Sequence, residues 1–185
     1  MLKIVTVPDK ILSSLTLKVK KIDNEIIQLV SDMEKTLIAQ KDPKGVGLAA
    51  NQVGESLSLF IIKPTEKAKT KVFINPKILK SEIRNPKSEI NHKSKIQKRK
   101  KQPVKLEGCL SIPRIWGPVR RAKKIFLEYQ NMKGNLYKKW FSGFEATIIQ
   151  HEVDHLNGVV FTQKSMEQNQ ILYKEIDGEL KQIEI

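Results

Sequence analysis

The sequence predicts an α+β fold in which mixed, mainly antiparallel strands pack around a central helix. Three observations support this class: the two helical segments lie far apart, the strands are short, and the strand–helix–strand alternation of a parallel sheet is missing. At 185 residues the chain has the length of one compact domain. We therefore expect a single domain that spans residues 1–185.

The first predicted helix begins at Asp23 or Asn24, either of which can cap it, and runs to about Gln40. Its apolar side chains recur at spacings of three and four residues, as expected for one face of a helix. These residues are Ile26, Val30, Met33 and Leu37. The sequence Asp42-Pro43-Lys44-Gly45 then breaks the helix.

Short runs of β-branched and aromatic residues predict the strands. Residues 59–62 and 71–74 form one pair, the second strand being ended by Asn75-Pro76. Residues 124–129 and 136–141 form another pair. Near the C-terminus, Asp177-Gly178 is a two-residue turn signal, which predicts a hairpin of residues 171–176 and 179–185.

The second predicted helix covers residues 144–156, is apolar on most sides, and ends at Asn157-Gly158. A helix that is apolar on most sides belongs in the interior, so we expect it to be the central element.

The charge is unevenly distributed. The chain carries 34 Lys and Arg against 20 Asp and Glu, a net charge of +14 with a pI near 9.8. Residues 81–105 hold nine of the basic residues and two Glu, with neither an aromatic residue nor a glycine. We expect this segment to be a basic, mobile loop inserted in the domain. A merely solvated loop and a contact with a polyanion both remain open.

Several classes of protein are excluded. No apolar run approaches the ~18 residues of a membrane span, and the N-terminal residues lack the apolar core of a signal peptide. Cys109 is the sole cysteine, which excludes an internal disulfide framework and fits a reducing compartment. A cytoplasmic protein without membrane association is expected.

The strongest local pattern is His151-Glu152-Val153-Asp154-His155 within the second helix. Residues four apart share one helix face, so both imidazoles can bind a single metal ion, and Glu152 can act as general base. Two buried histidines bonded to backbone carbonyls are the alternative.

A third ligand is needed, and the chain has no histidine after Gly158. Upstream, Glu107-Gly108-Cys109-Leu110-Ser111 offers Cys109. One thiolate with two imidazoles suits iron(II), zinc, nickel or cobalt. There are two competing interpretations of Cys109: it could be a nucleophile, or it could be a small buried apolar residue.

A third pattern runs from Gly45 to Gln52 as Gly-Val-Gly-Leu-Ala-Ala-Asn-Gln. Its small residues permit close approach of a packed element or an extended ligand. Because the lysine of a P-loop is missing, the pattern is not a P-loop. Gln52 could donate a hydrogen bond to a developing oxyanion, or could be an ordinary surface glutamine.

In this order, the three patterns resemble those of peptide deformylases, as do Ile4-Val5, Pro8-Asp9 and Ile74-Asn75-Pro76. The resemblance implies a metallohydrolase that removes the formyl group from the formyl-methionine of nascent polypeptides and releases formate. It implies one divalent metal ion, bound by a central metal-binding helix. Iron(II) is the most expected metal, and zinc, nickel and cobalt are the alternatives.

The resemblance also implies roles for individual residues. Cys109, His151 and His155 would bind the metal ion, with a metal-bound water as nucleophile. Glu152 would be the general acid and base, and Gln52 and the Leu110 backbone N–H the oxyanion donors. An extended peptide would pair near Gly47 as an added strand. The candidates for the methionine side-chain pocket are Val46, Phe144, Thr147 and Ile148.

Three features depart from the family pattern. The link between Pro76 and Glu107 is longer and more basic than usual, and Trp116 stands where many members carry Arg, although Arg121 matches a basic position. The C-terminal hairpin replaces the helix that many members use to dock on the ribosome. We therefore expect any ribosome contact to be made by the loop at 81–105.

Two other functions remain open. In a basic RNA- or ribosome-binding protein the metal site would be only structural, but such sites normally have four protein ligands. His92 lies in the predicted loop and is a poor fourth ligand. A zincin-type peptidase would require a ligand downstream of the helix.

Overall fold

The computed structural model describes residues 1–82 and 105–183, in which two antiparallel sheets surround a helix. The first sheet has the strand order β1 (Gly47–Ala49), β2 (Leu59–Ile62), β3 (Lys71–Glu82), β6 (Lys124–Gln130) and β7 (Leu136–Ser142). The second has the order β4 (Leu106–Cys109), β5 (Ile112–Pro118), β8 (Leu172–Ile176) and β9 (Glu179–Ile183). The helices are α1 (Asn24–Ala39), α2 (Gly143–Leu156), α3 (Phe161–Glu167) and the 3-10 turns η1 (Lys10–Ser13) and η2 (Ala50–Val53).

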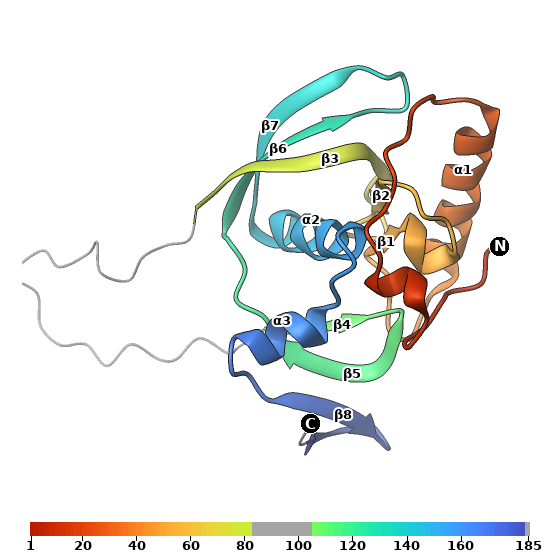
Figure 1. Cartoon of the computed structure of the whole chain (residues 1–185). Helices are drawn as coiled ribbons and strands as arrows, with labels where there is room; N and C mark the ends of the chain where they lie inside the picture. The colour runs from red at the N-terminus through yellow and green to blue at the C-terminus, as the bar shows by residue number, and fades with distance from the viewer. Residues whose placement is uncertain (83–104, 184–185) are drawn as a thin grey trace, which may run out of the picture.

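Helix α2 lies in the middle of the molecule, between the β3–β6–β7 part of the first sheet and the region of α3, β4 and β5 (Figure 1). Its Ala146, Ile148 and Ile149 are buried in one cluster with residues of the first sheet, among them Phe60 and Phe73. The predicted α+β class, with mainly antiparallel strands around a central helix, is confirmed.

The opposite face of the first sheet is covered by α1. The Asp23 carboxylate caps this helix by accepting a hydrogen bond from the Ile26 N–H at 3.3 Å. The predicted apolar face, Ile26 to Leu37, packs with Leu59 and Ile61 of β2. Because successive side chains of a strand point to opposite faces, β2 is buried on both sides.

The prediction that Asn75-Pro76 ends a strand is wrong. β3 continues to Glu82, and its register with β6 shifts between Ile74 and Lys77. Asn75 has a φ of 50°, and its side chain both accepts from the Val19 N–H and donates to the Val19 carbonyl at 2.9 Å. The proline, which lacks a backbone donor, thus sits in a bulge of the strand rather than at its end.

The boundaries of the predicted basic insertion also change. Ser81 and Glu82 belong to β3, where they pair with Ile125 and Lys124 of β6. Residues 83–104, including His92, lie outside the described residues. In the two described ranges, no helix is both long enough and apolar enough to cross a membrane.

The C-terminal hairpin is confirmed as β8 and β9, joined at Asp177-Gly178. It pairs through β8 with β5, so it extends the second sheet. The strands β1, β4 and β5 and the short helix α3 were not predicted.

The end of α2 yields a prediction. Gly158 has a φ of +70°, and a Cβ atom there would lie 2.7 Å from the Ser13 backbone. Gly178 has a similar φ of +79° but no atom within 4 Å of the same position. We expect Gly178→Ala to cost about 1–2 kcal/mol for the left-handed conformation alone. Gly158→Ala should cost about 1–3 kcal/mol more, because the backbone of Ser13 must move. Urea denaturation of both variants measures the difference, and equal losses would contradict the contact.

Candidate metal centre

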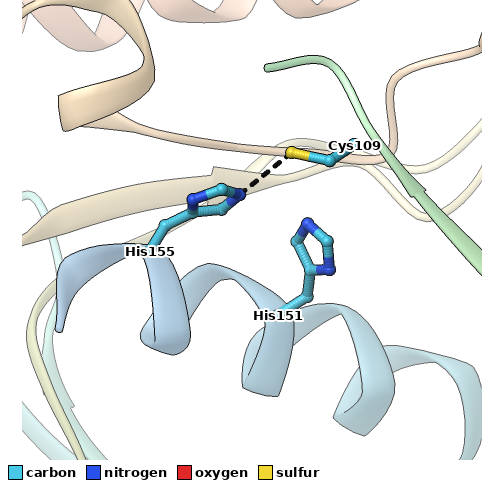
Figure 2. A group of neighbouring side chains, drawn as sticks. All are labelled: Cys109, His151 and His155. Carbon is cyan, nitrogen blue, oxygen red and sulfur yellow. Dashed lines mark hydrogen bonds between the residues drawn. The ribbon is translucent and has the colours of Figure 1, made fainter. Parts of the chain in front are cut away.

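Cys109, His151 and His155 converge at one point in the interior. One ligand atom from each lies within 4.8 Å of the others, and Cys109 Sγ is 3.1 Å from His155 Nε2. Figure 2 shows both imidazoles rising from the same face of α2 toward the cysteine. The predicted ligands, 42 and 46 positions apart along the chain, are therefore brought together by the fold.

Local structure explains each position. The two histidines are four residues apart in α2, which places them one turn apart on one face. Cys109 is the last residue of β4, where the register with β5 shifts and Cys109 pairs with Ile112 across a tight turn. Phe161 at the start of α3 stacks against the His151 ring, with centroids 6.1 Å apart.

The donors fit a divalent transition metal. One sulfur and two imidazole nitrogens leave a position open in a four-coordinate site, as in catalytic centres. Glu152 beside them is only 3% exposed, and its Oε2 has no hydrogen-bond partner among the described residues. A buried carboxylate oxygen without a partner is costly unless a ligand or a water satisfies it. Within the described residues, the rings of His151 and His155 make no hydrogen bond to a backbone carbonyl. This argues against the alternative of two buried histidines bonded to backbone carbonyls.

Glu107 orients His151. Its Oε2 accepts from His151 Nδ1 at 3.0 Å, while Arg121 donates two hydrogen bonds to the same carboxylate, each of 2.8 Å. Arg121 also donates to Asp154 of α2 at 2.5 Å. With Nδ1 engaged, the second ring nitrogen of His151 is the one that would be available to bind a metal ion.

The ion pair between Glu107 and Arg121 dominates the electrostatics of this network. Burial on its own would raise the pKa of Glu107, but the hydrogen bonds from Arg121 and His151 outweigh it and lower the pKa to about 2. The Arg121 guanidinium is 8% exposed, and its pKa is raised because Glu107 and Asp154 overcome the effect of burial. The carboxylate and the guanidinium are therefore both charged at neutral pH.

The ionisable groups at the centre are shifted as well. Burial would raise the pKa of Cys109, but the charge of His155 and the hydrogen bonds from both histidines hold it well below its ordinary value. Thiolate is the form that binds metals. Burial would lower the pKa of His151, yet its hydrogen bonds to Cys109 and Glu107 raise it. Burial raises the pKa of Glu152 to about 7.

Gln52 is not a surface residue but is 2% exposed in η2. The Ala49 N–H donates to Gln52 Oε1 at 2.9 Å, which fixes the orientation of the amide. Gln52 Nε2 then points at Ser111 Oγ (3.1 Å) and Cys109 Sγ (3.4 Å). An amide donor is thus fixed next to the predicted ligands.

A cavity of about 580 Å³ opens onto this centre. The predicted site residues on its wall are Val46, Gly47, Gln52, Cys109, Leu110, Phe144, Thr147, Ile148, His151 and Glu152. His155 lies behind the wall with no exposed surface. A Cβ at Gly47 would be 2.3 Å from Glu152 Oε1, so glycine is required where the strand passes the carboxylate.

Glu107, Arg121 and Asp154 carry no predicted role, although the structure places them next to the ligands. For Glu107 and Asp154, the spacing from the predicted ligands is a signal in the sequence that could have identified them. Glu107 precedes Cys109 by two residues, which puts both on one face of a strand, and Asp154 follows His151 by three on the helix. Arg121 is distant in sequence from both of its partners, so its match to a basic family position draws attention to it but only the fold shows what it bonds to.

The comparison with known proteins agrees with this geometry. Residues 1–170 match the sequence model of the family described as polypeptide deformylase. The peptide deformylase of Desulfotalea psychrophila is 33% identical over 177 residues, which cover 94% of this chain and 92% of that relative. The peptide deformylase of Psychrobacter arcticus is 37% identical over 162 residues, covering 87% and 77%.

Solved structures give the same result. The crystal structure of peptide deformylase from Thermotoga maritima is similar with a TM-score of 0.72 and 32% identity, covering 89% of this chain and 97% of that one. The structure of a peptide deformylase from Synechococcus elongatus in complex with actinonin has a TM-score of 0.72 and 31% identity, covering 89% and 80%. With a family match across most of its length and relatives above 30% identity, this chain belongs to the polypeptide deformylase family of enzymes.

Proposed function

We propose that the protein removes the N-formyl group from the formyl-methionine of nascent polypeptides and releases formate. The observation that carries this proposal is the convergence of Cys109, His151 and His155 beside the buried Glu152, at the wall of one cavity that Cys109, His151 and Glu152 line. The reaction takes place in the cytoplasm, and residues 1–185 act as one catalytic domain. Iron(II) is the first choice of metal, with zinc, nickel or cobalt as alternatives.

Cys109, His151 and His155 would hold the divalent ion. When bound, such an ion supplies Lewis-acid chemistry, lowering the pKa of a water in its open position and polarising the formyl carbonyl. The protein contributes the anionic thiolate and the fixed ring of His151, which Glu107 orients.

Glu152 moves the proton. Its carboxylate takes a proton from the attacking water, whose oxygen forms the new bond to the formyl carbon. The carbon–nitrogen bond then breaks, and the proton passes from Glu152 to the leaving amine, so formate and a free methionine amine result. Burial raises the pKa of Glu152 to about 7 in the metal-free protein, and a carboxyl group whose pKa lies near the working pH can serve as base and then as acid.

Gln52 and Leu110 are the proposed oxyanion donors. The Ala49 N–H fixes the orientation of the Gln52 amide, and Gln52 Nε2, which bonds to Ser111 and Cys109, would turn one N–H group to the oxyanion. Leu110 follows Cys109 and lies on the cavity wall, where its backbone N–H would be the second donor.

The substrate enters as an extended strand. β1 and β4 are terminal strands of their sheets, and residues of both line the cavity. A peptide can therefore pair with the sheet edge at Gly47 of β1. Its methionine side chain would pack against the part of the wall formed by Val46, Phe144, Thr147 and Ile148. Phe144 is 52% exposed, so substrate contact would cover apolar surface that is otherwise open.

A cysteine nucleophile is the second candidate, because Cys109 Sγ and His155 Nε2 are 3.1 Å apart. In that mechanism His151 would only help to lower the pKa of the thiolate, and the buried Glu152 would have no role. A metal centre uses all four groups, and we favour it for this reason.

Ribosome contact through residues 81–105 is a separate proposal. It rests on the charge of +7 that the sequence concentrates in this segment. Substrates that emerge from the ribosome would meet an enzyme already attracted to ribosomal RNA.

The roles of ligand and base can be separated by mutation. We expect Cys109→Ser to lower the bound metal per chain, because the soft thiolate is lost. Glu152→Gln should retain the metal and reduce kcat about 10²–10⁴-fold, because proton transfer is lost. Metal analysis and anaerobic formate release from a formyl-Met tripeptide measure both effects.

Glu145→Gln is the matched control, since Glu145 lies in the first turn of the same helix and pairs with Lys71 at the surface. It should leave metal content and kcat unchanged. Undiminished activity of Glu152→Gln would contradict the mechanism. A metal-bound wild type that releases no formate would favour a binding module instead.

The Glu107 network predicts a pH dependence of stability. A pKa of about 2 in the folded state, against 4.5 in the unfolded chain, means that the unfolded state takes up the proton first on acidification. The stabilisation is fully present above pH 4.5 and is lost as the pH falls toward 2. Between pH 6 and pH 3 the wild type should lose about 2 kcal/mol more than Glu107→Gln.

Urea denaturation of the metal-free protein at the two pH values measures this difference. Glu55→Gln, which removes an exposed carboxylate, is the control and should follow the wild type. Equal losses in the wild type and in Glu107→Gln would show that Glu107 is not the group responsible.

A further inference from the structure

Trp116 forms part of the cavity wall from an element remote from α2. It lies in β5 opposite Gly108 of β4, the residue next to Cys109. A Cβ atom at Gly108 would lie 2.7 Å from Trp116 Cζ3 and 2.9 Å from Cε3, so the six-membered ring of the indole lies directly over this glycine. The ring is only partly buried and faces the cavity together with Leu106 and Val119.

The indole is held in place by the C-terminal hairpin. Trp116 Nε1–H donates to Glu175 Oε2 at 3.0 Å, and Glu175 lies in β8, which pairs with β5 at Trp116 and Tyr173. Figure 1 shows β8 running beside β5. Arg114 Nη1 is 3.9 Å from the other Glu175 oxygen, which adds a weak, solvent-exposed ion pair. Once the N–H is satisfied, the remainder of the ring offers an apolar surface to a ligand.

Apolar side chains thus line the cavity from two separate elements. Phe144, Thr147 and Ile148 of α2 form the wall assigned to methionine, whereas Trp116 belongs to β5 and lies over Gly108, next to Cys109. An extended peptide that places methionine on the α2 wall must continue past the ligands, and a later side chain can reach the second wall. Lys44 and Lys105 also line the cavity, so basic side chains are disfavoured there.

We propose that Trp116 is a specificity-determining residue, and Glu175 its positioning residue, for the side chains that follow the formyl-methionine. The indole favours an aromatic or large aliphatic side chain at the second or third position of the peptide. This inference rests on the proposed deformylase function.

The test compares formyl-Met peptides carrying Phe, Leu, Gly or Lys at the second or third position. For the wild type, kcat/KM should be about tenfold higher with Phe than with Gly at one of these positions. Trp116→Ala should reduce this ratio to about one. Trp116→Phe retains a flat apolar face and should keep most of the preference. With formyl-Met amide, which lacks the later residues, all variants should match the wild type.

Glu175 is tested through the same ratio. Glu175→Ala removes the acceptor and should lower the Phe/Gly ratio through KM, with kcat unchanged, whereas Glu175→Gln keeps an acceptor oxygen and should restore it. A variant that merely destabilised the hairpin would lower the rate with every substrate alike.

A second readout is independent of catalysis. The chain has two tryptophans, so Trp140→Phe leaves Trp116 as the sole indole. The product peptide Met-Phe-Ser should shift the Trp116 emission, and Met-Gly-Ser should do so less. Deformylation without any Phe preference, or an emission unaffected by both peptides, would overturn the inference. No deformylation of any substrate would instead overturn the proposed function.

Discussion

Glu107 receives two hydrogen bonds from Arg121 and one from His151 where its side chain is only 11% exposed. The carboxylate belongs to β4 and the imidazole to α2, so this contact joins the second sheet to the central helix. Cys109 is two residues from Glu107, and the relative position of thiolate and imidazoles therefore depends on it. Burial disfavours the ionised form of Glu107, and these donors reverse that effect, while Arg121 fixes the network further through Asp154.

Close packing fixes the positions of the remaining groups around the contact between Glu107 and His151. Glycine at 47 leaves room for Glu152, and glycine at 108 leaves room for the Trp116 ring. The N-terminal segment bonds to both neighbouring motifs, through Val5 N–H to the Gln52 carbonyl at 2.8 Å and Val7 N–H to the Ser111 carbonyl at 3.1 Å. The cavity is lined by residues of four chain segments, 43–52, 105–110, 116–121 and 144–152, and the N-terminal segment bonds at the ends of the first two.

Periodicity predicts the elements that are long or cleanly patterned. The apolar spacing from Ile26 to Leu37 and the uniformly apolar region around His151 identify α1 and α2 to within one residue. The strands β4 and β5 were missed because one contains Gly108 and the other Pro113 and Gly117, which are typical of loops. The metal ligands follow from local motifs. The hydrogen bonds that Arg121 makes to Glu107 and that Glu175 accepts from Trp116 do not, since contacts across 14 and 59 positions leave no local pattern.

The dependence of the metal centre on Glu107 is tested most directly by the metal affinity of Glu107→Ala. Zn²⁺ dissociation constants of the wild type and this variant can be measured by competition with a chelator, with circular dichroism confirming that both are folded. The account predicts affinity about 10–100-fold weaker in the variant, because His151 loses the acceptor that fixes its ring. An unchanged dissociation constant in a folded variant would contradict it.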